Sequence, residues 1–90
     1  MGLRLRLDDL TSHDGWFFNL RSCNQQPMTL DVSRGERETS SFFIRNDLVH
    51  TNDGTSISGI ESRDGMYVID KPASLIEAVR NSASLAASCC

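Results

Sequence analysis

The chain has 90 residues, of which 39% are hydrophobic and 23% are charged, and its formal net charge at pH 7 is -3. This length and composition predict one globular domain, residues 1–90, with a single modest core, and they exclude a largely disordered chain. The nine basic and twelve acidic residues are mixed along the sequence, so it shows no basic face of the kind that binds nucleic acid nonspecifically. We therefore expect no nucleic-acid partner.

The distribution of apolar residues and cysteines predicts a cytoplasmic protein. The first twenty residues carry Arg and Asp throughout, and no apolar run approaches the roughly 18 residues that span a membrane. We therefore expect no signal peptide and no membrane association. Three cysteines are an odd number and do not indicate a disulfide framework. Cys89 and Cys90 are interpreted as inert thiols at the end of a helix, and the sequence leaves open whether they are modified.

The first half of the chain contains three segments with the pattern of β-strands. Residues 2–8 alternate leucine with charged residues, which is typical of a strand with one buried face. Residues 16–21 are rich in aromatic side chains, and residues 28–32 alternate again. Between the first two segments, the polar residues 11–15 end in Asp14-Gly15 and predict a turn.

The second half contains further short strands separated by turn signals. Residues 33–38 are the most polar stretch and predict an exposed connection. Two turns are indicated by Asn52-Asp53-Gly54 and by Ser62-Arg63-Asp64-Gly65. The predicted strands of this half are residues 39–45, 48–51, 56–60 and 66–69.

A helix is predicted for residues 71–88. Asp70 is a suitable N-cap, and Pro72 is tolerated in the first turn. Apolar residues at helical spacing fall within about a third of the circumference, and they become small towards the end of the segment. We expect the first turns to pack firmly and the last turn to be weak. The apolar stripe comprises Leu75, Ile76, Val79, Ala83, Ala86, Ala87 and Cys90.

These elements define an α+β fold. We predict a mostly antiparallel sheet of about six short strands, all within residues 2–69, with one C-terminal helix packed on it. Short turns between successive strands favour a meander, curled or partly barrel-like.

The aromatic residues are the best candidates for a binding surface or pocket. Adjacent aromatics on one strand, such as Phe42 and Phe43, point to opposite faces, so a single helix cannot cover all of them. The second face then needs another cover, and a second copy of the chain is the commonest one. The candidate residues are Trp16, Phe18, Phe43 and Tyr67.

The leading hypothesis is a non-catalytic protein–protein interaction module that acts as a homodimer or binds an unidentified protein partner. The alternative is a small-molecule-binding protein with an aromatic pocket between sheet and helix, lined by Trp16, Phe18 and Tyr67. The least favoured hypothesis is a small enzyme that uses His13 or His50 as a base. We predict no catalytic residues, no metal site and no cofactor.

Overall fold

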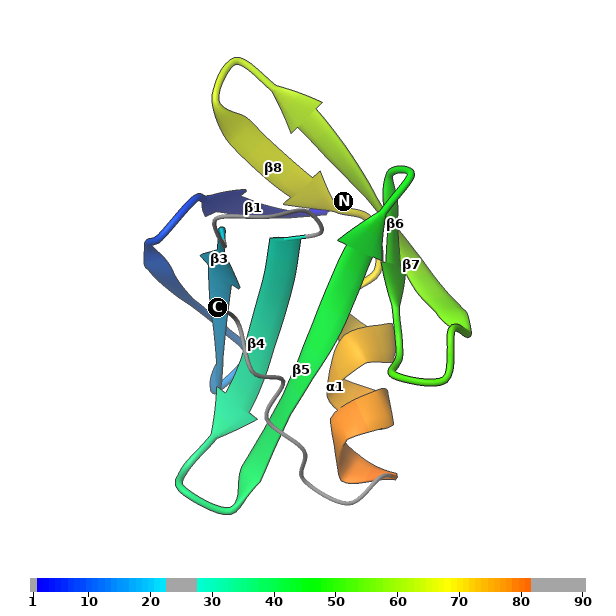
Figure 1. Ribbon diagram of the computed structural model, residues 1–90. Coiled ribbons are helices and arrows are strands. Elements are labelled where there is room, and N and C mark those ends of the chain that lie inside the picture. Colours follow the sequence, from blue (N-terminus) through cyan, green and yellow to red (C-terminus); the bar gives the residue numbers. More distant parts are fainter. Residues whose placement is uncertain (1, 23–27, 82–90) are drawn as a thin grey trace.

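A computed structural model describes residues 2–22 and 28–81 of the chain. In these residues it contains eight strands and one helix (Figure 1). The strands are β1 (Leu3–Arg6), β2 (Leu10–His13), β3 (Trp16–Arg21), β4 (Met28–Arg34), β5 (Glu38–Arg45), β6 (Leu48–His50), β7 (Ser56–Arg63) and β8 (Met66–Ile69), and the helix is α1 (Pro72–Arg80).

The sheet is an antiparallel meander that curls back on itself. From β2 to β8 each strand pairs with the next one in the chain, and β1 pairs with β8. The two ends of the sheet approach each other where Leu7 forms an isolated bridge with Leu20 and the Asp8 N–H donates to the Leu20 carbonyl at 2.7 Å. The predicted α+β fold is confirmed, with an almost barrel-shaped sheet of eight strands where about six were expected.

Strand β2 lies where the sequence analysis predicted a turn. Only Asp14 and Gly15 form the turn, with φ angles of 55° and 82°, and His13 pairs directly with Trp16. This left-handed two-residue turn matches the twist of a hairpin, so it brings the preceding residues into register with β3. Thr11 and Ser12 are therefore extended because of pairing, although their own composition does not favour a strand.

Strand β7 belongs to two parts of the sheet. Its first half pairs with β6, with a bulge at Val49/His50, and its second half pairs with β8. The β7–β8 hairpin consequently projects from one end of the barrel, at the top of Figure 1. Its turn is Asp64-Gly65, whereas the turn was predicted to begin at Ser62; Ser62 and Arg63 extend β7 because they pair with β8.

The core fills the inside of the curled sheet, and α1 packs against it. Inward positions alternate along the strands, and Leu75, Ile76 and Val79 of α1 join the same cluster. Complete burial of one such side chain contributes about 1.5–3 kcal/mol, so the first two turns of α1 are firmly attached. The strands supply Leu5, Trp16, Phe18, Leu20, Leu30, Val32, Phe42, Ile44, Val49, Ile60 and Ile69.

The start of α1 differs from the prediction by one residue. Lys71 occupies the N-cap position and makes no side-chain capping bond, so the assignment of Asp70 as the cap was wrong. The Asp70 carboxylate accepts hydrogen bonds from the Ser58 hydroxyl and from the Gly59 N–H at 2.9 Å, and so it ties the start of the helix to β7. The helix ends at Arg80, and the predicted continuation over residues 82–88 lies outside the described residues.

Candidate functional sites

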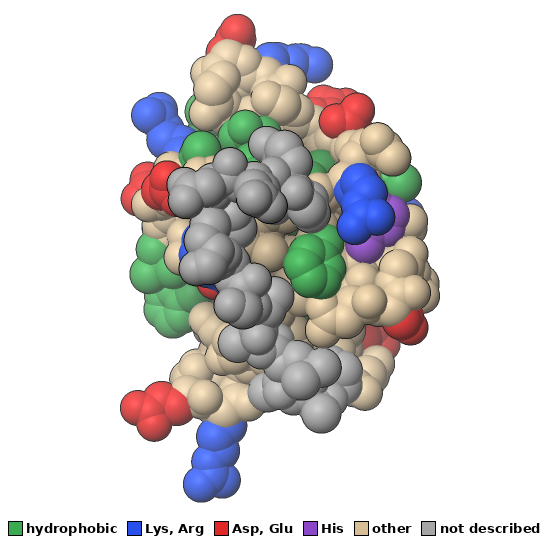
Figure 2. All heavy atoms as spheres, in the orientation of Figure 1, with side chains coloured by type: hydrophobic (Ala, Val, Ile, Leu, Met, Phe, Trp, Pro, Cys, Tyr) green, Lys and Arg blue, Asp and Glu red, His purple; other side chains and the backbone are tan. Residues whose placement is uncertain are grey.

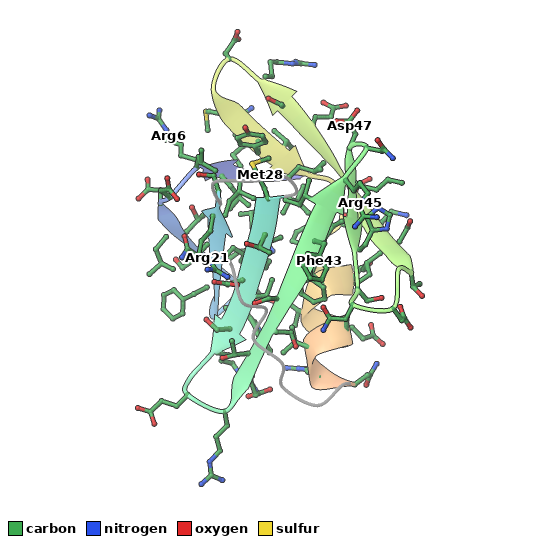
Figure 3. All side chains as sticks on the ribbon, in the orientation of Figure 1. Arg6, Arg21, Met28, Phe43, Arg45 and Asp47 are labelled. Carbon is green, nitrogen blue, oxygen red and sulfur yellow. The ribbon has the colours of Figure 1, made fainter. Side chains whose placement is uncertain are left out.

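Adjacent aromatic residues lie on opposite faces of the sheet. On β3, Trp16 and Phe18 are buried in the core while Phe17 is 43% exposed. On β5, Phe42 is buried and Phe43 is half-buried on the outer face, where it projects beside Arg45 (Figure 3). The alternation of a strand therefore leaves two aromatic rings outside the barrel.

The most exposed apolar side chains lie on the β2–β3 hairpin. Leu10 is 63% exposed and pairs with Asn19, two residues from Phe17 on the same face. Such diagonal neighbours are about 7–8 Å apart, so the two side chains form one patch. We call Leu10 and Phe17 the apolar edge surface. Hydrophobic side chains gather on this side of the molecule, to the left in Figure 2.

A polar network on the outer face links three neighbouring strands. Arg21 of β3 donates from Nη2 to Asp31 of β4 at 3.1 Å, and its Nε lies 2.6 Å from the other carboxylate oxygen without the alignment of a hydrogen bond. The Ser41 hydroxyl of β5 donates to Asp31 at 2.6 Å. Because the charges of Arg21 and Asp31 are paired, the network connects the strands rather than presenting a free charge.

A cavity of about 660 Å³ lies between α1 and the sheet around the indole of Trp16. The guanidinium groups of Arg34 and Arg80 lie 4.9 and 5.8 Å from the ring centroid, within cation–π range. Arg34 also pairs with Glu38 at 2.7 Å, and Asp14 and Glu77 line the same space. We call this space the indole cavity. Trp16 itself is only 2% exposed, and the mixed charges around it suit a small polar ligand better than a simple anion.

A second cavity, of about 760 Å³, follows the projecting β7–β8 hairpin. Its walls include Glu61 and Arg63, whose charged groups lie 3.8 Å apart, and the carboxylate of Asp70. The hydrogen bond from Ser58 is the main cause that lowers the pKa of Asp70 below its ordinary value of 3.8. This carboxylate is already occupied by its structural partners, so it is a poor candidate for proton transfer.

The two histidines are held by local contacts. The His13 ring lies edge-on to Phe18, with centroids 6.2 Å apart. The His50 ring nitrogens lie 3.2 Å from the Arg45 carbonyl and 3.4 Å from the Gly54 carbonyl. Packing against Phe18 therefore explains the position of the His13 ring, and contacts with loop carbonyls explain the position of the His50 ring.

The four predicted site residues do not form one site. Trp16 lines the indole cavity, Phe18 is fully buried, Phe43 lies on the outer face, and Tyr67 is half-buried opposite Leu5. The two arginines around Trp16 were missed because sheet pairing and helix docking bring them there from distant positions. Leu10 was missed because its strand was interpreted as a turn. The Asp14-Gly15 hairpin signal is the feature of the sequence that points to it.

Within the described residues, no helix has the length and apolar character needed to cross a membrane. The same part of the chain contains no group of three or more potential metal ligands. Comparisons with protein-family models, with curated proteins and with solved structures gave no match. The apolar edge surface and the indole cavity are therefore defined by geometry and chemistry alone.

Proposed function

We propose that this protein is a non-catalytic protein–protein interaction module that acts as a homodimer. The observation that carries the proposal is the apolar edge surface, where Leu10 and Phe17 are diagonal neighbours, both exposed on one face of an edge hairpin. Water contact with these two side chains is unfavourable, and association that buries them contributes about 25 cal/mol per Å² of apolar area. Closed twofold dimers are the commonest soluble assemblies, which favours a second copy as the partner.

Light scattering on the reduced protein at tens of micromolar tests this function. We expect the mass of a dimer for the natural chain and of a monomer for the double variant Leu10→Ser/Phe17→Ser. Substitutions of exposed residues are expected to leave the fold intact. Circular dichroism of the variant checks this expectation. The matched control is Leu48→Ser, which removes another exposed leucine, on β6, four strands from β2 in the sheet order. A strictly monomeric natural chain would overturn the proposal.

The indole cavity favours the second candidate function, binding of a small polar molecule. Trp16 reports on this site directly, because it is the single tryptophan of the chain. We expect a metabolite screen to find a compound that changes its fluorescence, with an affinity weakened by Arg80→Ala. Unchanged fluorescence throughout, together with native mass spectra that show only the bare chain, would remove this candidate.

A further inference from the structure

The free edge of β2 carries backbone groups that are arranged to pair with another strand. The two-residue turn makes His13 and Trp16 a hydrogen-bonded pair, and by alternation Thr11 and Phe18 are another. The N–H and C=O groups of Leu10 and Ser12 must therefore point away from β3. Among the described residues β2 pairs only with β3, and both Leu10 and Ser12 are exposed.

We propose that β2 of one chain pairs antiparallel with β2 of a second copy, so that the two sheets become continuous across a twofold axis at Thr11. This inference rests on the proposed homodimer and specifies its interface. In this register Leu10 lies opposite Ser12 of the second copy, and all four free backbone groups of each strand form hydrogen bonds. A register centred on Leu10 or on Ser12 pairs fewer of them, because Asp8 and Asp14 have left-handed φ angles of 62° and 55° and leave the strand line.

The side chains on the outer face are complementary in the same register. Leu10 of the second copy lies beside the small Ser12, with Phe17 on the next strand of the same row. The apolar edge surfaces of the two copies then merge into one cluster of two leucines and two phenylalanines. The apolar area that this cluster removes from water contributes about 25 cal/mol per Å².

A side-chain hydrogen bond also favours a second copy as the occupant of this edge. Asp9 immediately precedes β2 and His13 ends it, so the register places Asp9 opposite His13 of the second copy, twice by symmetry. In this register the His13 imidazole N–H donates to the Asp9 carboxylate of the other copy. The sequence of the edge is thus complementary to itself when it runs antiparallel.

Cysteine cross-linking tests the register in a chain whose Cys23, Cys89 and Cys90 are replaced by Ser. At the axis the two Thr11 Cα atoms are about 4.5 Å apart, within the range that a disulfide spans. The Ser12 Cα atoms are roughly 8 Å apart, beyond that range. Under mild oxidation we expect at least tenfold more covalent dimer from Thr11→Cys than from Ser12→Cys. Random collision favours the opposite order, because Ser12 is the more exposed residue.

A backbone substitution gives a second measurement. Ser12→Pro deletes an N–H that points away from β3, so an edge strand tolerates it while the dimer loses two hydrogen bonds. We expect the dissociation constant to rise at least tenfold, and Ser12→Ala to leave it within twofold. Two results would overturn this register while leaving the homodimer in place, provided that the natural chain scatters as a dimer. One is cross-linking of Ser12→Cys as efficient as that of Thr11→Cys, and the other is an unchanged dissociation constant for Ser12→Pro. Monomeric scattering of the natural chain overturns both the register and the homodimer.

Discussion

At the scale of single residues, the neighbours Ser40 and Ser41 are predicted to affect stability in opposite directions. Ser40 lies on the inner face opposite Val32, and its hydroxyl is buried without a hydrogen-bond partner among the described residues. A buried hydroxyl without a partner is costly, so Ser40→Ala should raise the free energy of unfolding by about 1 kcal/mol. Ser41→Ala removes the hydroxyl that donates to Asp31 and should lower it by about 1–2 kcal/mol. Urea titration at one protein concentration compares the two, and a loss for Ser40→Ala equal to that for Ser41→Ala would contradict the assignment.

The Asp70 carboxylate is predicted to make stability depend on pH. Its pKa in the folded chain lies below 3.8, chiefly because of the hydrogen bond from Ser58, so it stabilises the fold above that pH. The contribution is lost as the pH falls through the folded pKa. Since the residue is solvent-exposed, Asp70→Ala should cost only about 1 kcal/mol at pH 7 and less at pH 3. Urea midpoints at both pH values measure this effect, and Ser58→Ala should reproduce most of it. A cost independent of pH would count against the hydrogen-bonded carboxylate.

The position of a side chain could be predicted from the sequence where neighbouring residues alone determine it. The separation of Phe42 from Phe43 follows from strand alternation alone, and the sequence was sufficient to expect it. The contacts of Arg34 and Arg80 with Trp16 depend on where α1 meets the sheet, which no local pattern encodes. The same holds for Asp70, whose side chain is suited to cap a helix but accepts a hydrogen bond from the Gly59 N–H of β7 instead.

At the scale of elements, a substitution in the β5–β6 turn is predicted to raise the free energy of unfolding. Asn46 and Asp47 both have left-handed φ angles, 55° and 62°, which side-chain-bearing residues adopt at a cost. Asp47→Gly relieves the second position, where glycine is the preferred residue of this turn type. After the larger entropy loss of glycine, we expect the free energy of unfolding to rise by up to about 1 kcal/mol. The control Asp47→Ala should lower it, and thermal unfolding of both variants decides whether the backbone conformation is the cause.

The elements themselves were largely predictable because most of them alternate and are bounded by Gly or Asp turns. β2 was the exception, because Thr11-Ser12-His13 lacks apolar alternation and becomes a strand only by pairing with β3. That exception bears directly on the proposed function, since β2 is the edge strand that carries Leu10. Pairing with β3 keeps β2 extended, so the backbone groups on its other edge are already in position to pair with a further strand.

At the scale of the whole molecule, the curled meander places β2 at one end of the sheet, and this strand carries the proposed interface. The β1 end of the sheet is brought towards β3 through the Leu7–Leu20 bridge, and α1 packs against the core. The edge of β2 remains, with its free backbone groups and exposed leucine. Barrel closure removes edges, and an incompletely closed barrel keeps one that a second copy is suited to cover.

This arrangement predicts that thermal stability rises with protein concentration. When folding is linked to dimer formation, each tenfold increase above the dissociation constant stabilises each chain by about 0.7 kcal/mol, half of the 1.4 kcal/mol of a tenfold equilibrium change. For a domain of this size that corresponds to a rise in Tm of roughly 3–5 °C. Leu10→Ser/Phe17→Ser should abolish the dependence while leaving the Tm at low concentration almost unchanged, because both side chains lie outside the core. Scanning calorimetry from a few to several hundred micromolar makes the measurement. A Tm independent of concentration in the natural chain would mean that the β2 edge stays unpaired in solution.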